Sequence, residues 1–220
     1  KCSNKKKIKY LPTWADDQLI GEIDHNNLKL FKKHFFYITF TGNIGEAQDF
    51  DNILKAAELI KNNDKIKWLI VGDGSKLEWL KKQIKKKELF DNFILTGHVS
   101  KNQIPQILNK SDCLLVTLKK GGIDEFTVPG KLSNYMISKK PILGMINGET
   151  LDIIKNSKSG LFCKSGDYKK LSENIIKISN YSDKKLRNMG KNGFEYAKKY
   201  FDRTEQLKKV ETYLKKLISN

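Results

Sequence analysis

Long apolar stretches are missing from this 220-residue sequence. None approaches the ~18–20 residues that a membrane-spanning helix needs, so we do not expect an integral membrane protein. The basic stretch Lys1–Lys7 is not followed by the apolar core of a signal peptide. With 39% hydrophobic and 10% aromatic residues, the chain has enough apolar material for a core. We therefore expect a soluble, folded protein.

Cysteine and histidine are also scarce. Cys2, Cys113 and Cys163 are odd in number and show no paired spacing. This argues against a disulfide framework and favours a reducing, cytoplasmic setting. The three histidines are scattered, without the short spacing of a metal-binding motif such as HExxH. The sequence therefore predicts no metal site.

Arginine is nearly absent, although the formal net charge is +17. Arg187 and Arg203 are the two arginines, and lysine carries the rest of the positive charge. A basic balance suits nucleic acid, an anionic membrane surface or a phosphorylated ligand. Because proteins that read nucleic acid rely on arginine for bidentate contacts, we do not expect a nucleic-acid partner. The lysine bias of an AT-rich genome is a plainer explanation, and peripheral association with the inner face of a membrane stays open.

Short apolar runs alternate with amphipathic stretches from Phe35 onward. Several runs are apolar at nearly every position, which is typical of strands buried on both faces of a parallel sheet. The predicted strands are Phe36–Thr41, Lys67–Val71, Phe93–Thr96, Cys113–Leu118, Pro141–Ile146 and Gly160–Cys163. The helices predicted between them are Ala47–Lys61, Ser75–Lys87, Lys101–Asn109, Lys131–Ser138 and Glu149–Asn156. This alternation predicts an α/β fold with a Rossmann-like, doubly wound parallel sheet.

The end of the chain changes character. Three helices are predicted in succession, Asp167–Ser179, Asp183–Tyr200 and Asp202–Ile218, and each opens on an aspartate, a favoured N-cap residue. We expect a domain over residues 35–200, a connection and edge segment at 1–34, and a helix at 201–220 that packs on this domain or on another one. Because the sequence opens in mid-pattern, we also expect it to be part of a longer protein.

The loop after the first strand is one candidate site, because ligands of an open parallel sheet bind beyond the carboxyl ends of its strands. Gly42 and Gly45 match part of the dinucleotide fingerprint GxGxxG, with Phe40 where the first glycine belongs. Such glycines let backbone N–H groups approach a phosphate. A tight turn between strand and helix is the alternative explanation.

The loop after the second strand contains Gly72 and Gly74 around Asp73. Small residues before a helix serve a turn equally well, with Ser75 as a helix cap. An acidic residue here also matches the position where a nicotinamide enzyme holds a ribose hydroxyl. A nicotinamide oxidoreductase therefore stays open as an alternative.

The loop before the helix at Lys131–Ser138 is the most informative. A glycine pair and the acidic pair Asp124 and Glu125 lead to a helix that opens with Gly130 and Lys131. The free N–H groups and the dipole of a helix N-terminus attract anions. Because that position normally favours Asp or Glu, a lysine there indicates a bound phosphate. A solvated lysine in a lysine-rich chain is the alternative.

With these residues together, the sequence resembles the C-terminal domain of family-4 retaining glycosyltransferases of the GT-B fold, closest to bacterial enzymes that build surface polysaccharides. The resemblance covers most of the chain, from IKYLPTWAD to the final helices. The order and spacing of four segments carry it: FTGNIGEAQDFDNILKAAELI, WLIVGDGS, FILTGHVSKNQIPQILNKSDCLLVTL and EFTVPGKLSNYMISKKPIL. It implies a domain that binds a nucleotide-diphosphate sugar without a metal, a UDP-sugar being the commonest donor in the resembling group.

The resemblance also implies where the nucleotide base lies. Gly97, His98 and Val99, in the loop after the third strand, would border the base together with Ile104. From the residues alone, a histidine such as His98 is more often a solvent-facing loop residue than a ligand.

Two candidate catalytic residues follow from the resemblance. Lys131, with the helix start at Gly130, would hold the diphosphate, and Glu125 matches the first acidic residue of the family's paired-glutamate motif near the donor sugar. The glycine loops after the first two strands would line the same cleft.

Two departures from the family pattern affect this site. The second glutamate of the motif, which usually binds the ribose, is replaced by Asn134, whose amide binds hydroxyls without charge assistance. The basic pair that many members carry after the first strand is also absent, with Glu46 and Gln48 in that stretch. Lys131 is then the expected main cation for the diphosphate.

The expected function is donor binding for hexosyl or N-acetylhexosaminyl transfer in bacterial surface polysaccharide synthesis. The saccharide or lipid-linked acceptor would bind through an N-terminal domain that this sequence does not contain, so we expect this chain alone to transfer no sugar. A non-catalytic module that binds nucleotides or anions is the alternative beside the oxidoreductase.

Overall fold

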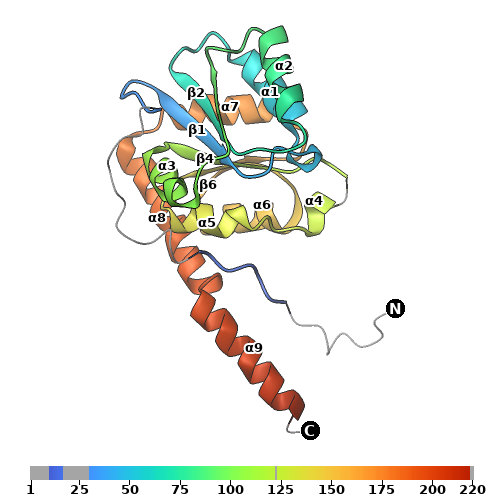
Figure 1. Cartoon of the computed structure of the whole chain (residues 1–220). Helices are drawn as coiled ribbons and strands as arrows, with labels where there is room; N and C mark the ends of the chain where they lie inside the picture. Colours follow the sequence, from blue (N-terminus) through green and yellow to red (C-terminus); the bar gives the residue numbers. More distant parts are fainter. Residues whose placement is uncertain (1–9, 17–29, 122, 219–220) are drawn as a thin grey trace.

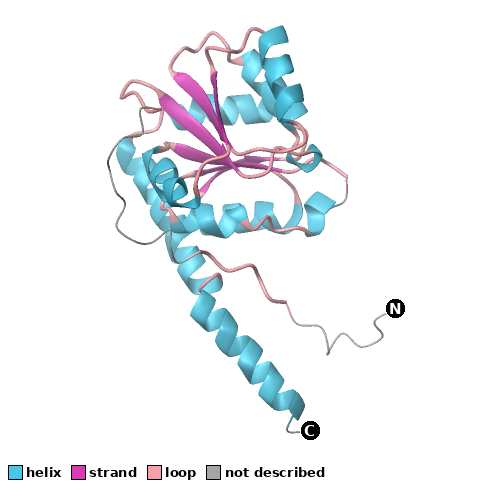
Figure 2. Ribbon diagram, viewed as in Figure 1, coloured by secondary structure: helices cyan, strands magenta, loops and turns pink. Residues whose placement is uncertain are grey.

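The computed structural model describes residues 10–16, 30–121 and 123–218. Its six strands form one parallel sheet in the order β3-β2-β1-β4-β5-β6 (Figures 1 and 2). The strands are β1 (Phe36–Thr41), β2 (Ile66–Val71), β3 (Phe93–Gly97), β4 (Cys113–Thr117), β5 (Ile142–Met145) and β6 (Gly160–Cys163). The order runs outward in both directions from the central pair β1 and β4, so the sheet is doubly wound. The predicted fold class is confirmed.

Helices cover both faces of the sheet (Figure 1). The α-helices are α1 (Phe50–Leu59), α2 (Leu77–Lys86), α3 (Ile104–Lys110), α4 (Ile123–Phe126), α5 (Lys131–Ile137), α6 (Gly148–Ser157), α7 (Tyr168–Ser179), α8 (Asp183–Tyr200) and α9 (Arg203–Ile218), and the 3-10 turns are η3 (Glu46–Gln48) and η4 (Lys101–Gln103). One face carries α1, α2 and α7, and the other carries α3, α5, α6 and α8. This two-sided cover explains why the central strands are apolar at almost every position.

The core lies on either side of the sheet. On the face of α1, α2 and α7, the rings of Trp68 and Phe93 stack with their centroids 5.6 Å apart. On the other face, Leu132 and Tyr135 of α5 are fully buried beside Ile154 of α6. Burial of each large apolar side chain contributes about 1.5–3 kcal/mol, so this packing fixes the positions of the helices over the sheet.

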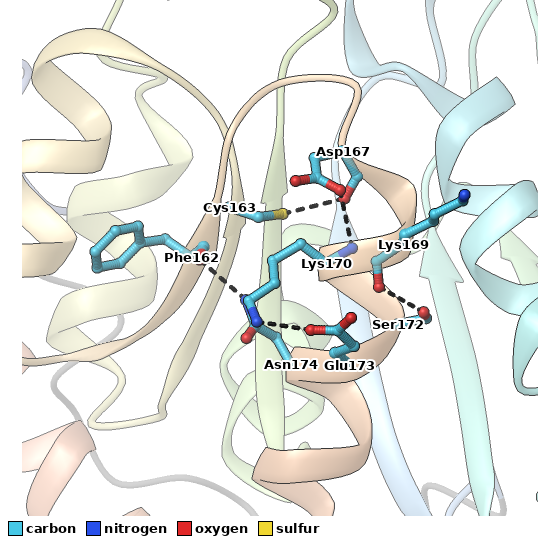
Figure 3. A network of polar contacts seen from close by, with 8 residues as sticks. All are labelled: Phe162, Cys163, Asp167, Lys169, Lys170, Ser172, Glu173 and Asn174. Carbon is cyan, nitrogen blue, oxygen red and sulfur yellow. Dashed lines mark hydrogen bonds and ion pairs between the residues drawn. The ribbon is translucent and has the colours of Figure 1, made fainter.

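The start of α7 shows how a helix is joined to the last strand (Figure 3). Asp167 caps α7, because its Oδ1 accepts the Lys170 N–H at 2.9 Å. Inside the helix, the buried Asn174 amide donates to the Phe162 carbonyl oxygen at 3.0 Å. The Cys163 thiol is buried, and burial raises its pKa to about 12. This cysteine is a packing residue, as free cysteines in apolar strands usually are.

The caps of the last two helices differ from each other. The expectation that Asp183 caps α8 is wrong: Ser182 is the N-cap, and its Oγ accepts the Lys185 N–H at 3.4 Å. Asp202 does cap α9, because its Oδ1 accepts the Glu205 N–H at 2.9 Å.

Helix α9 extends away from the sheet (Figure 1). Gln206 in its first turn is buried, but Leu207, Leu214 and Leu217 are exposed. These leucines therefore do not pack on this sheet, and their packing on another domain stays a prediction. In the described ranges, none of the helices combines the length and the apolar character that crossing a membrane requires.

Two local differences from the predicted elements lie beside the candidate site. Helix α1 begins at Phe50 and not at Ala47, because Asp49 has a φ of 54° and separates the helix from η3. The turn α4 was not predicted; it is closed by the buried Asp124 carboxylate, which accepts the Gly121 N–H at 3.1 Å. Of the expected connection at 1–34, residues 1–9 and 17–29 lie outside the described residues. Gly122, in the loop before α4, also lies outside them.

Candidate functional site

The strand order reverses between β1 and β4, and this switch point is where open α/β sheets bind ligands. The chain after β1 forms η3, and residues at the end of β4 and just after it hold that turn in place. The Lys119 N–H donates to the Ala47 carbonyl oxygen at 2.9 Å, and the Thr117 hydroxyl donates to the Gln48 carbonyl oxygen at 2.6 Å. The turn η3 is thus fixed at the carboxyl ends of the two central strands.

Lys131, the first residue of α5, reaches this turn. Its Nζ donates to Gln48 Oε1 at 3.0 Å and lies 3.7 Å from the centroid of the Phe40 ring. A Cβ atom built on Gly42 would lie 3.4 Å from the same Nζ. Two of the predicted site residues, Lys131 and Gly42, therefore meet at the switch point.

The surroundings of the Lys131 ammonium are uncharged. Its neighbours are the Gln48 amide, the Phe40 ring and Gly42, which has no side chain, and no carboxylate of the described residues pairs with it. Burial lowers the pKa of Lys131 to about 7. A charged group kept from water without a counterion is costly, so an anion that reaches Nζ is strongly favoured.

Tyr135 positions α5 against the end of β1. Its hydroxyl oxygen accepts the Thr41 N–H at 2.7 Å and lies 3.1 Å from Thr41 Oγ1. Both residues are buried, and burial raises the pKa of Tyr135 to about 12. Tyr135 lies one helical turn after Lys131, so this contact sets where Lys131 enters the site. Sequence reasoning missed it; a tyrosine among the apolar residues of a buried helix was the available signal.

The glycine loops bind one another. The Gly42 N–H donates to the Val71 carbonyl oxygen and the Gly72 N–H to the Gly97 carbonyl oxygen, both at 2.9 Å. A Cβ atom on Gly72 would lie 2.0 Å from the Gly42 carbonyl oxygen. The Gly42 and Gly72 N–H groups are thus bonded to backbone, as in a tight turn, and the role of these glycines in lining the donor cleft stays a prediction.

The other two glycines have similar roles. The Gly74 N–H donates to Asp73 Oδ1 at 2.6 Å, and a Cβ on Gly74 would lie 2.5 Å from the Ile44 carbonyl oxygen. Gly45 is the N-cap of η3, where a Cβ would lie 2.6 Å from the Asn43 amide nitrogen. Ser75 is not a cap, because α2 begins at Leu77 after Lys76.

The predicted base-binding residues lie together beyond β3. Gly97 has a φ of 68° and open space where a side chain would be. His98 is exposed, while Val99 and Ile104 are half-buried against the apolar cluster that contains Val71. Ser100 is the N-cap of η4, and Gln103 Oε1 accepts its N–H at 3.1 Å.

The acidic pair after β4 divides into two roles. Asp124 is buried and bonds the Asn147 amide at 2.6 Å, which ties α4 to the loop after β5. Glu125 is exposed and lines a pocket of about 420 Å³ with Tyr10 and Glu149. Glu125 is thus the member of the pair that is open to a ligand.

Asn134 contacts the segment at residues 10–16. Its Oδ1 accepts the Asp16 N–H at 2.8 Å. Asn134 and Gly130 also line a pocket of about 490 Å³ with Trp14 and Arg203. The expected free N–H groups at the start of α5 are reduced, because the Leu132 N–H donates to the Pro129 carbonyl oxygen at 2.8 Å. Lys131 itself is therefore the main electrostatic feature of this helix start.

Two lysines that sequence reasoning missed lie at the same edge. Lys76, after β2, and Lys119, after β4, both pair with Glu46 of η3. Hydrogen bonds from Lys119 and Lys76 lower the pKa of Glu46 to about 2. No spacing signal connects these residues, since they come from three separate loops. In the described part of the chain, no group of three or more His, Cys, Asp or Glu side chains is arranged to hold a metal ion.

Comparison with known families identifies the family of the chain. Residues 22–196 match the family described as Glycosyl transferases group 1, which is more than half of the chain. The chain belongs to the group 1 glycosyl transferases. The resemblance in the sequence is confirmed, and the sheet with its trailing helices is the C-terminal half of a GT-B fold. Membership in this family argues against the oxidoreductase alternative.

Two similar curated proteins are bacterial. The chain is 33% identical over 99 residues to the putative colanic acid biosynthesis glycosyl transferase WcaI of Escherichia coli (strain K12). This match covers 45% of this chain and 24% of that protein. The chain is 26% identical over 187 residues to the probable glycosyltransferase WbjE of Pseudomonas aeruginosa, covering 81% of this chain and 45% of that protein. The chain thus spans less than half the length of these relatives.

A solved structure shares the fold. Anabaena Alr3699/HepE in complex with UDP and glucose superposes with a TM-score of 0.69 at 16% identity, over 83% of this chain and 48% of that one. At this identity the likeness concerns the fold alone.

Proposed function

We propose that this chain is the donor-binding domain of a retaining glycosyltransferase, and that its donor is a UDP-sugar bound without a metal. Family membership supports the reaction class, since group 1 enzymes use nucleotide-sugar donors and are generally metal-independent. The observation that carries the donor site is the Lys131 ammonium. It lies half-buried at the switch point of the sheet, and no described carboxylate neutralises it.

The chemistry of transfer requires a cation at this place. When the sugar leaves its nucleotide, negative charge grows on the diphosphate and must be stabilised by fixed donors and cations. Lys131 is suited to this task because Gln48 and the Phe40 ring position Nζ without neutralising its charge. We assign Lys131 to the diphosphate, Glu125 to the donor sugar, and Asn134 to the ribose.

The wider role rests on the relatives. HepE is described with UDP and glucose, which supports UDP as the nucleotide and a hexose as the sugar. The name of WcaI, a colanic acid biosynthesis enzyme, supports a role in bacterial surface polysaccharide synthesis. We propose a cytoplasmic enzyme at the inner face of the membrane, whose saccharide or lipid-linked acceptor binds through a further domain. The connection before residue 35 and α9 would join the two domains.

Titration calorimetry of the 220-residue chain tests the donor site. UDP should bind, uridine should bind more weakly, and EDTA should change neither, because Lys131 and not a metal neutralises the diphosphate. NAD and duplex DNA serve as competing ligands. A strict requirement for Mg²⁺ or Mn²⁺ would contradict the metal-free site. Tighter binding of NAD or DNA than of UDP would favour a module that binds other anions.

A further inference from the structure

Glu46 joins two lysines that come from different loops. Lys76 Nζ lies 2.6 Å from Glu46 Oε2, and the Lys119 ammonium contacts the other oxygen, Oε1. Both carboxylate oxygens are therefore occupied by ammonium groups. This is the arrangement by which lysines hold an anion, supplied here by the protein's own side chain.

The pairs lie beside the Lys131 site. Glu46 and Gln48 belong to the same three-residue turn, η3, and Gln48 Oε1 accepts from Lys131 Nζ at 3.0 Å. Lys119 also holds that turn through its own N–H, which donates to the Ala47 carbonyl oxygen. Ammonium groups from three separate segments thus converge on η3, and Glu46 provides the negative charge that faces two of them.

The contacts of Glu46 are open to exchange. The Glu46 side chain is 57% exposed, that of Lys119 is 48% exposed and that of Lys76 is 29% exposed. Ion pairs in contact with water are weak, because solvent and salt compete for both partners. A phosphate group presents more negative charge and more acceptor oxygens than a carboxylate, so it is the stronger partner for the same lysines.

The exposed carboxylate is also ionised throughout the useful pH range. The two lysines lower the pKa of Glu46 to about 2. Glu46 therefore stays a negatively charged competitor at any pH where the protein would meet its donor.

We propose that Glu46 competes with the donor diphosphate for Lys76 and Lys119, and that these two lysines join Lys131 in binding the diphosphate once Glu46 is displaced. This inference rests on the proposed function and adds two cations to it. It also accounts for the missing basic pair after β1: the loops after β2 and β4 supply lysines to the same turn.

The test is Glu46→Gln, which keeps the shape of the side chain and removes its charge. Binding of UDP and of inorganic pyrophosphate is measured by calorimetry at low salt, with uridine as the uncharged probe. UDP and pyrophosphate should bind about three- to tenfold more tightly to the variant, the range expected for releasing two solvent-exposed ion pairs. Uridine binding should not change. Glu78→Gln is the matched control, because Glu78 pairs with Lys81 at 2.6 Å on the exposed side of α2.

A second comparison makes the test specific for the two lysines. Lys76→Ala with Lys119→Ala should weaken UDP binding, and adding Glu46→Gln to this pair should then have no effect. Equal or weaker binding of UDP to Glu46→Gln would overturn the inference, as would a gain that persists without the two lysines.

The pyrophosphate arm separates this inference from the proposed function. UDP could fail to bind the parent chain while pyrophosphate binds it, and binds Glu46→Gln more tightly. That result would support competition by Glu46 and contradict the assignment of a nucleotide donor. If neither anion binds the parent or the variant, both proposals fall.

Discussion

Two groups of lysines lie at the carboxyl edge of the sheet, and they differ in what surrounds them. Lys131, carried by α5, is half-buried among uncharged groups, and burial lowers its pKa to about 7. Lys119, carried by a loop, is exposed, and its hydrogen bond to Glu46 raises its pKa. Two lysines at one edge of the sheet thus have pKa values shifted in opposite directions. Within residues 10–16, 30–121 and 123–218, no carboxylate pairs with the half-buried Lys131, whereas the exposed lysines already have a counterion and can exchange it.

The largest effect on UDP binding should come from removing the half-buried lysine, Lys131. Lys131→Ala should weaken UDP binding about ten- to a hundredfold, since a charge-assisted hydrogen bond contributes about 1.5–3 kcal/mol. Uridine binding should be almost unchanged, because uridine has no phosphate. Lys55→Ala is the matched control: Lys55 also bonds an amide oxygen, at 3.4 Å from Asn52, and lies over a ring, 5.5 Å from that of Tyr168. Parent-like UDP binding by Lys131→Ala would remove the anion site from α5.

The comparison can be sharpened by pH. Because burial lowers the pKa of Lys131 to about 7, its side chain is largely in the neutral amine form at pH 8. A bound diphosphate stabilises the charged form, so binding at pH 8 should take up a proton. The affinity for UDP should fall by up to about tenfold per pH unit above pH 7.5, until the pKa of the complex is passed. Calorimetry in two buffers with different ionisation enthalpies counts the proton, and Lys131→Ala should take up none.

Folding stability should respond to pH in the opposite direction. Between pH 7 and the ordinary pKa of 10.5, the unfolded chain holds a proton on Lys131 that the folded chain has lost. The contribution of this group to stability therefore rises with pH across that window and is least favourable below pH 7. Urea unfolding of the parent and of Lys131→Ala at pH 6 and pH 9 would show whether the difference between them shrinks as pH rises.

The smallest effect should come from the uncharged residue of α5. Asn134→Ala should weaken uridine and UDP alike by a few-fold, the size expected for one neutral hydrogen bond, while Asn134→Glu should hold or improve both. Asn134 also binds the Asp16 N–H, so the control is Ser133→Ala, which removes the neighbouring bond to the Trp14 carbonyl oxygen. Unchanged uridine binding in Asn134→Ala would reject the ribose assignment.

The fold was largely predictable because its signals are local. The bounds of β1, β6 and α8 agree with the predicted ones, since continuous apolar runs and regular helical spacing depend on neighbouring residues. The position of Lys131 at the start of α5 was also predictable, because a lysine at a helix start after a strand is itself a local pattern, and its role in the site stays a prediction. The 3-10 turn at η3 was missed, since it depends on one residue, Asp49, with a positive φ.

The remaining parts of the site depend on contacts between distant residues. Tyr135 and Thr41 are 94 positions apart, and Asn134 and Asp16 are 118 apart. Glu46 was recognised only as a departure from a basic pair, because the lysines that bind it follow other strands. Such pairings arise only when the sheet brings separate loops to one edge, and no spacing in a single sequence encodes them.

The hydrogen bonds between the glycine loops have a consequence for the entropy of binding. Gly42 is bonded to Val71 and Gly72 to Gly97, so the backbone after β1, β2 and β3 forms one connected layer before any donor arrives. Ordering a loop of free chain on binding costs about 1–2 kcal/mol per residue, and here that cost has already been met in folding. The conformational entropy that remains to be lost on binding is that of the lysine side chains at the carboxyl edge of the sheet. Affinity in this site should therefore depend on how those few side chains are held, and little on any closing of the backbone around the nucleotide.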